Sequence, residues 1–440
     1  MDRDLHAFDE ALDELLVAHR EAKSALDRRV PKSADARPAD TPVLRSPLLH
    51  PEVFHELNES SEPLARALLP WVEVLLDERW AWEDTARLAE LRSALRPTPQ
   101  LDEPTTIRAM VRGVIGGRTA GARRDHGAAL RATAEELSAR AASAIEARRE
   151  RADGTRFGDV AEVPAGVVAA LAARVLDRTD DLAGEAMRRG WVEGVHATVG
   201  RSASDGWPAK LTWRWAGSVF GDAGWFDGVA PALGAPPRPW GGSSFARALG
   251  GLGSALLTAC RPATLPRALH QHPFGVRRHR RYSLFSSIAT TATFGQRVLG
   301  LGRERAEAHA RAMGTASIAA LRVDAMRVLV ARALNDGRQA AAETLAEVSD
   351  RLFGEPAPPA TLAVVPRLRP AHGAAFVGSV LSFADGRGLA ERHDLDWFRN
   401  PRAAAELRAA FDKPADLTPI AEDEVQQALS ALADALEAPF

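Results

Sequence analysis

Cysteine, lysine and tyrosine are scarce in this chain of 440 residues. Cys260 is the single cysteine, so no disulfide can form within the chain, which fits a reducing compartment. Lysine occurs only at Lys23, Lys32, Lys210 and Lys413, so arginine carries almost all of the positive charge. A GC-rich genome explains this bias, and selection for arginine as a bidentate anion ligand is the alternative.

Long hydrophobic runs are also missing. The apolar run "VPAGVVAALAARVL" (163–176) is too short to span a bilayer and contains Arg174. The first ten residues, "MDRDLHAFDE", are acidic and amphipathic, unlike a secretory signal. The formal net charge of −2 argues against polyanion binding by bulk electrostatics. We therefore expect a soluble, cytoplasmic protein with no membrane role, and nucleic-acid binding is not expected because no recognition module is present.

Familiar catalytic motifs are absent or broken. The sequence has neither a G-x-S-x-G nucleophile turn nor a G-x-G-x-x-G cofactor turn. "VIGGRTAGARRD" (114–125) has the glycine spacing of a phosphate loop, but Ala122-Arg123 replaces its Lys-Ser/Thr pair. "FHELNE" (54–59) begins like the zinc-peptidase motif HExxH, but Glu59 replaces the second histidine. These departures favour a glycine-broken helix junction and a polar helix face.

Two Glu-x-x-His pairs, Glu52/His55 and Glu193/His196, have the spacing found in di-iron helical bundles. About one such pair is expected by chance in a chain of this composition. We therefore interpret both pairs as solvated or capping groups, and we expect neither a metal nor a cofactor.

Apolar residues recur at three- and four-residue steps, and sustained strand alternation is missing. We predict an all-α, multi-helix globular protein of two or three domains. We also expect a bend or break before Pro70 and a helix start at Asn400-Pro401. The predicted regions are an amphipathic helix (1–29), a Pro-rich linker (30–47), an N-terminal helical domain (48–204), an irregular Trp-rich segment (205–245), a central helical region (246–353), a Pro-rich connection (354–370) and a C-terminal helical region (371–440).

The segment 205–245 is rich in tryptophan, glycine and proline, which argues against a regular helix or strand. Long irregular loops are often functional. Its tryptophans either belong to the core or line a ligand cleft, since tryptophan is enriched at binding sites. The candidate cleft residues are Trp207, Trp213, Trp215, Trp225 and Trp240.

The stretch "LPRALHQHPFGVRRHRRYSLF" (265–285) concentrates histidine and arginine ahead of an expected helix at 283–300. His270, His272 and His279 suggest zinc, but the turn at 273–275 and the neighbouring positive charge argue against it. Pairing of the arginines with acidic helices is the favoured interpretation. Binding of an anion or an acidic partner is the functional alternative. The residues that would carry it are Arg277, Arg278, Arg280, Arg281 and His279.

The C-terminal half loosely resembles the helical bowl of thimet- and oligoendopeptidase-type zinc peptidases. The resemblance rests on long helices, a helix pair rich in small residues, and "RPAHGAAFVGSVLSFADG" (369–386). In that family a late segment bearing histidine and aromatic residues faces the peptide cleft. Because HExxH is missing here, the resemblance implies a degenerate, non-hydrolytic scaffold and carries over no catalytic residue.

The incomplete catalytic sets and the amphipathic terminal helices favour a soluble binding, scaffold or regulatory protein. Its expected partner is a protein, with an anionic ligand as a further candidate. An enzyme or small-molecule binder is the less favoured alternative, because helical enzymes can assemble sites from dispersed residues. Its cleft would lie between 205–245 and 267–285.

Overall fold

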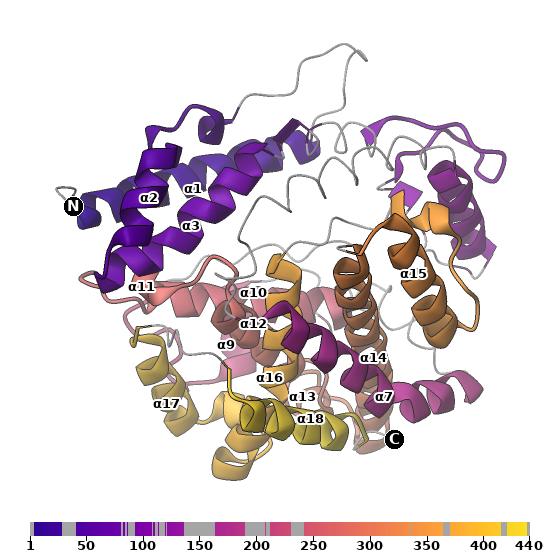
Figure 1. Cartoon of the computed structure of the whole chain (residues 1–440). Coiled ribbons are helices and arrows are strands. Elements are labelled where there is room, and N and C mark those ends of the chain that lie inside the picture. Colours follow the sequence, from indigo (N-terminus) through magenta and orange to yellow (C-terminus); the bar gives the residue numbers. More distant parts are fainter. Residues whose placement is uncertain are drawn as a thin grey trace.

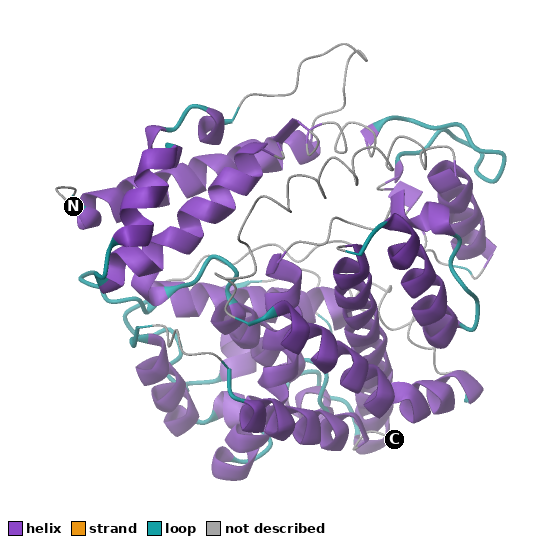
Figure 2. Cartoon of the chain, in the orientation of Figure 1, coloured by secondary structure: helices purple, strands orange, loops and turns teal. Residues whose placement is uncertain are grey.

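The computed structural model describes residues 4–28, 41–80, 93–107, 121–135, 163–189, 212–229, 242–334, 336–363, 370–414 and 420–437, with scattered positions (82, 83, 86, 109, 110, 113, 119 and 207) between them. Within these residues the regular elements are helices, and Arg96 and Thr105 form one isolated antiparallel bridge. The predicted all-α, multi-helix fold is confirmed (Figure 2).

The α-helices are, in chain order, α1 (Leu5–Arg28), α2 (Pro51–Glu59), α3 (Pro63–Trp80), α7 (Ala165–Arg188), α9 (Trp213–Phe220), α10 (Gly242–Ala259), α11 (Arg267–His270), α12 (Val276–Ile288), α13 (Ala292–Arg297), α14 (Arg303–Leu334), α15 (Arg338–Phe353), α16 (Pro370–His393), α17 (Pro401–Phe411) and α18 (Glu422–Glu437). Short 3₁₀ turns are η1 (Pro42–Leu44), η2 (Pro47–Leu49), η3 (Pro359–Ala363) and η4 (Trp397–Arg399).

Helices α1, α2 and α3 form a group at one edge of the molecule (Figure 1). The predicted amphipathic helix is confirmed as α1, whose apolar stripe, including Leu5, Phe8 and Leu12, is buried in this group. The sequence predicts that the helix bends or breaks before Pro70. The structure has no break there, because α3 continues through that residue. Pro70 is buried there, and packing of the helix offsets the hydrogen bond that proline cannot donate.

Helix α12 lies between α10 and α16 in the main body of the molecule (Figure 1). Helix α18 packs on α16 and α7, and α14 packs against α7 and α15. One hydrophobic core includes side chains of α9, α10, α12 and α17, and a second includes side chains of α7, α14, α16 and α18. Helix α12 contributes to both, through Phe285 to the first and Val276 to the second.

Capping side chains explain where two helices begin. The predicted start at Asn400-Pro401 is confirmed, because the Asn400 side chain accepts a hydrogen bond from the Arg402 N–H and Pro401 is the first helical residue of α17. Thr212 caps α9 in the same way.

Helix α9 lies inside the segment 205–245, which the sequence predicts to be irregular, and the structure corrects that prediction. The apolar side chains of Val219 and Phe220 pack into the first core and hold the helix there.

The terminal helices both use their apolar faces within the chain. Val425, Leu429 and Leu432 of α18 are buried in the second core, as the stripe of α1 is buried in the N-terminal group. The apolar faces that the sequence offered for partner docking are therefore covered within the chain.

Candidate functional site

The arginine-rich stretch forms the first turns of α12, and the helix begins at Val276 instead of near 283. Gly275 has a φ of 68°, in the left-handed region that glycine tolerates, and it ends the preceding turn. The four arginines are thus helical residues, and not part of a loop ahead of the helix. Because α10 and α16 pack against α12, they determine which of the four arginines are accessible to a ligand.

Three glycines let α12 approach its neighbours closely. A Cβ atom on Gly253 of α10 would lie 2.6 Å from Cγ of Phe285 and 2.8 Å from the carbonyl oxygen of Arg281. A Cβ atom on Gly378 of α16 would lie 2.7 Å from the backbone nitrogen of Arg280, and Gly250 makes a similar approach to Tyr282. The backbone of α12 therefore lies directly against α10 and α16 at these glycines.

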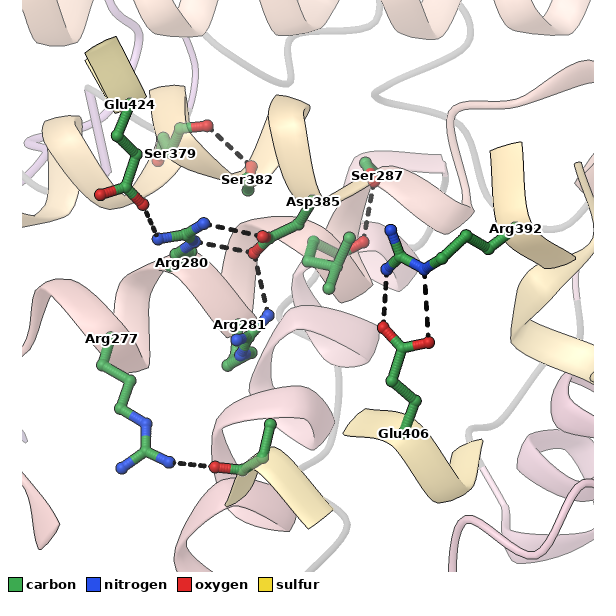
Figure 3. A network of polar contacts seen from close by, with 12 residues as sticks. Arg277, Arg280, Arg281, Ser287, Ser379, Ser382, Asp385, Arg392, Glu406 and Glu424 are labelled. Carbon is green, nitrogen blue, oxygen red and sulfur yellow. Dashed lines mark hydrogen bonds and ion pairs between the residues drawn. The ribbon is translucent and has the colours of Figure 1, made fainter. Parts of the chain in front are cut away.

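Arg280 and Arg281 share the carboxylate of Asp385 on α16 (Figure 3). Arg280 binds it through two hydrogen bonds of 2.8 Å, and its third contact is Glu424 of α18 at 2.6 Å. Arg281 binds the same carboxylate at 2.9 Å. The network ties three helices together, and it matches the favoured interpretation that these arginines pair with acidic helices.

Burial and charge act in opposite directions on this pair of arginines. Burial by itself lowers the pKa of Arg280, but the hydrogen bonds and charges of Asp385 and Glu424 outweigh it, so the pKa of Arg280 is raised. For Arg281, burial outweighs the attraction of Asp385, and the pKa of Arg281 is lowered. Both stay protonated, since an arginine is not deprotonated near neutral pH.

Arg277 uses a different acceptor, the carboxyl end of α17. Its guanidinium donates to the carbonyl oxygens of Ala410, Phe411 and Lys413, the last at 2.9 Å. The last carbonyls of a helix lack partners and carry partial negative charge, so a buried cation is favourable there. Burial lowers the pKa of Arg277 to about 10, which still leaves it charged.

Arg278 and His279 differ from the other three. Arg278 is exposed, and its side chain has no polar partner within the described part of the chain. His279 is half-buried, and its Cβ lies 2.9 Å from where a Cβ on Gly378 would be. Of the predicted anion-binding set, Arg277, Arg280 and Arg281 therefore already bind groups of the chain itself, and only Arg278 is open to solvent.

His270 and His272 of this stretch contact different groups. His270 bonds to the carbonyl oxygen of Phe411, and His272 accepts a hydrogen bond from the Phe274 N–H. Among the described residues, no group of three or more histidine, cysteine, aspartate or glutamate side chains has a geometry that could hold a metal ion. His55, Glu56 and Glu59 of "FHELNE" lie on the exposed face of α2. The pair Glu193/His196 lies outside the described residues.

The tryptophans of 205–245 lie mostly in the first core. Trp207 and Trp225 are buried there, and Trp215 packs against it. The Trp225 ring lies 5.2 Å from that of Phe285 on α12, so at this point the two segments that would border the alternative cleft are in direct contact. The Trp225 indole also donates to the Phe398 carbonyl at 2.8 Å. The backbone of Trp213 begins α9, whereas its side chain and the whole of Trp240 lie outside the described part.

The outward face of α1 is a feature that the sequence analysis missed. A hollow of about 490 Å³ runs along it, lined by Glu10, Asp13, Glu14, Val17, Ala18 and Glu21. Asp13 forms an ion pair with Arg267, whereas Glu10, Glu14 and Glu21 are exposed and have no ionic partner among the described residues. Val17 lies between them and is 45% exposed. The spacing 10, 14, 17, 21 is the helical signal that could have revealed this face, opposite the apolar stripe.

Comparisons with family models, with curated proteins and with solved structures found no significant match to this chain. The likeness to helical zinc peptidases therefore rests on pattern alone. Its late segment, 369–386, falls largely within α16, whose Gly378 packs against α12.

Across the described helices, none combines the length and apolar character needed to cross a membrane.

Proposed function

We propose that this protein acts by binding, and that it receives a basic amphipathic helix of a partner protein along the outward face of α1. The observation that carries the proposal is the hollow on that face, in which exposed carboxylates surround the apolar side chain of Val17. This is the chemical complement of a helix that has an apolar stripe flanked by lysine or arginine.

The dimensions support a helical partner. Glu10 and Glu21 are 11 positions apart, which corresponds to about 16 Å along a helix axis, or three turns. A partner helix lying beside α1 over this length would bring its basic residues near Glu10, Glu14 and Glu21. Val17, near the middle, would supply the apolar contact.

The opposite face of α1 supports a rigid platform. Phe8 and Leu12 are buried in the N-terminal core, and Asp9 accepts hydrogen bonds from the backbone N–H groups of Arg267 and Ala268 at 2.7 and 3.0 Å. Because α1 is held on this side, binding on the other side does not have to order the helix first, which lowers the entropic cost of association.

Fluorescence anisotropy tests the proposal with a labelled lysine–leucine amphipathic peptide of about 18 residues, titrated with the full-length protein. The variant E10Q/E14Q/E21Q should bind about tenfold more weakly, equal to about 1.4 kcal/mol, and the loss should shrink at high salt. A glutamate–leucine peptide of the same length should not bind the wild-type protein.

The matched control is E62Q/E343Q/E391Q, which changes the net charge equally at exposed carboxylates away from the hollow. It should bind the basic peptide as the wild-type protein does. Equal weakening by both triple variants would mean that the peptide senses only net charge, and the proposal would then be wrong.

A further inference from the structure

A fully buried histidine joins α11 to the carboxyl end of α17. His270 is 0% exposed, and its Nε2 donates to the carbonyl oxygen of Phe411 at 2.8 Å. Because a carbonyl can only accept, Nε2 carries the proton of the neutral ring, and Nδ1 is left with a lone pair. Nδ1 is buried and has no hydrogen-bond partner among the described residues. A proton added to this ring would therefore have no acceptor there.

The charges around His270 are mainly positive. On α12, Arg277 donates to the carbonyl oxygen of His270 at 3.3 Å, and the Arg281 guanidinium lies 5.7 Å from the centre of the Phe411 ring. After α10, Arg261 adds a further positive charge, and Asp412, just beyond α17, adds the opposing negative one. A protonated His270 would thus be a second buried cation beside Arg277, competing for the same helix end.

We propose that His270 is a proton-sensitive lock, in which protonation of its ring places a second cation and an unpartnered Nδ1–H in the buried site and thereby favours release of the carboxyl end of α17 from α11 and α12. The neutral ring and the Arg277 guanidinium both bind carbonyl groups at 410–413, so the uncharged ring fits this site without adding a second buried cation. When the carboxyl end of α17 moves away, Arg277 loses the carbonyl oxygens to which it donates. Its guanidinium is then exposed to solvent. This proposal is independent of partner binding on α1.

The direction of the pH effect follows from the environment. Burial lowers the pKa of His270 below its ordinary value of 6.5, the bond to Phe411 opposes this, and Arg277 and Arg261 lower the pKa further. The opened state binds the proton more readily, so closure is fully favourable above about pH 6.5 and is lost progressively as pH falls below it. Each unit by which the folded pKa lies below the unfolded one changes the opening equilibrium about tenfold at low pH.

Hydrogen exchange measured by mass spectrometry on the full-length chain tests the lock. The wild type is compared with His270→Gln, whose side-chain amide can donate to the Phe411 carbonyl but does not titrate. At about pH 7.5 the wild type should protect 401–413 at least as well as the variant. At about pH 5.5 the ratio of wild-type to variant exchange rates in 401–413 should have risen, by up to about tenfold.

The control is His309→Gln, because His309 is also buried and makes the same kind of bond, from Nε2 to the Ala289 carbonyl at 2.9 Å. Exchange in 401–413 of that variant should follow the wild type at both pH values. A wild-type to His270→Gln ratio that does not change with pH overturns the proposal.

A direct titration of His270 by NMR in the ¹³C-histidine-labelled wild-type protein decides the matter if His270→Gln does not fold. A folded-state pKa below about 6.5 is expected, and a value at or above it contradicts the lock.

Discussion

Helices α12 and α1 are both rich in charge, and they differ in where that charge is satisfied. On α12, Arg277, Arg280 and Arg281 each bind a carbonyl or carboxylate of another helix. On α1, the outward carboxylates of Glu10 and Glu14 are exposed and have no ionic partner in the described part of the chain. Enclosure explains the difference, because an unpaired charge is costly inside a protein, whereas water solvates it at an edge.

The comparison teaches that the density of charged residues is a poor guide to a binding surface. The arginines of α12 attract attention in the sequence, yet they serve mainly to join α12 to α16, α17 and α18. The acidic face of α1 is less conspicuous but remains open to solvent. The following predictions test whether the charges of α12 are structural in this sense.

The largest effect is expected for Asp385→Ala, which leaves both Arg280 and Arg281 without their shared carboxylate. The side chains of Arg281 and Asp385 are only 14% and 16% exposed, so the loss should be about 3–5 kcal/mol in the free energy of unfolding. Urea denaturation measures it. The control is Asp434→Ala, which breaks the exposed ion pair with Arg387 and should cost less than about 1 kcal/mol. Similar losses in the two variants would contradict an interior role for the network.

A smaller loss is expected for Gly253→Ala, because its new Cβ would overlap Phe285 and the Arg281 carbonyl on α12. We expect a destabilisation of about 1–3 kcal/mol, measured by thermal or chemical unfolding. Gly251→Ala is the matched control in the same helix, since a Cβ there meets no atom within 4 Å. It should be neutral or stabilise the protein by up to about 1 kcal/mol, through the higher helix propensity of alanine. If both substitutions stabilise the protein, α10 and α12 are not in backbone contact.

The smallest effects on the free energy of unfolding are expected for two adjacent arginines, Arg277 and Arg278, which should differ from each other. Arg277→Gln should cost about 1–2 kcal/mol in unfolding free energy, because it removes charged hydrogen bonds to the end of α17. Arg278→Gln should stay within about 0.5 kcal/mol, because Arg278 is exposed and its side chain has no polar partner among the described residues. Guanidinium denaturation at one pH compares the two. An equal response would remove the distinction between buried and open members of the arginine stretch.

Long-range contacts explain why the sites were only partly predictable. The helical periodicity of α1 and the cap at Asn400 are local patterns, and both are confirmed. The partner of Arg281 is 104 positions away, and the Phe411 carbonyl is 134 positions from Arg277. No spacing rule connects residues so far apart, so the sequence left a structural role and a binding role both open for the same arginines.

Helix α9 shows the same limit on a smaller scale. Glycine and proline around it indicated irregular structure, but the Thr212 cap and burial of Phe220 in the core favour a helix. Local propensity is weak compared with packing, and a short helix is stable where its apolar face is covered.

The sequence by itself determined that this chain is helical, that its first helix is amphipathic, and that its cations are almost all arginines. Only the tertiary structure decided which charges are paired, because pairing depends on which helices enclose α12. It also decided that His270 is buried beside arginines while Glu10 and Glu14 face solvent. Periodicity is a property of neighbouring residues, whereas burial is a property of the assembled fold.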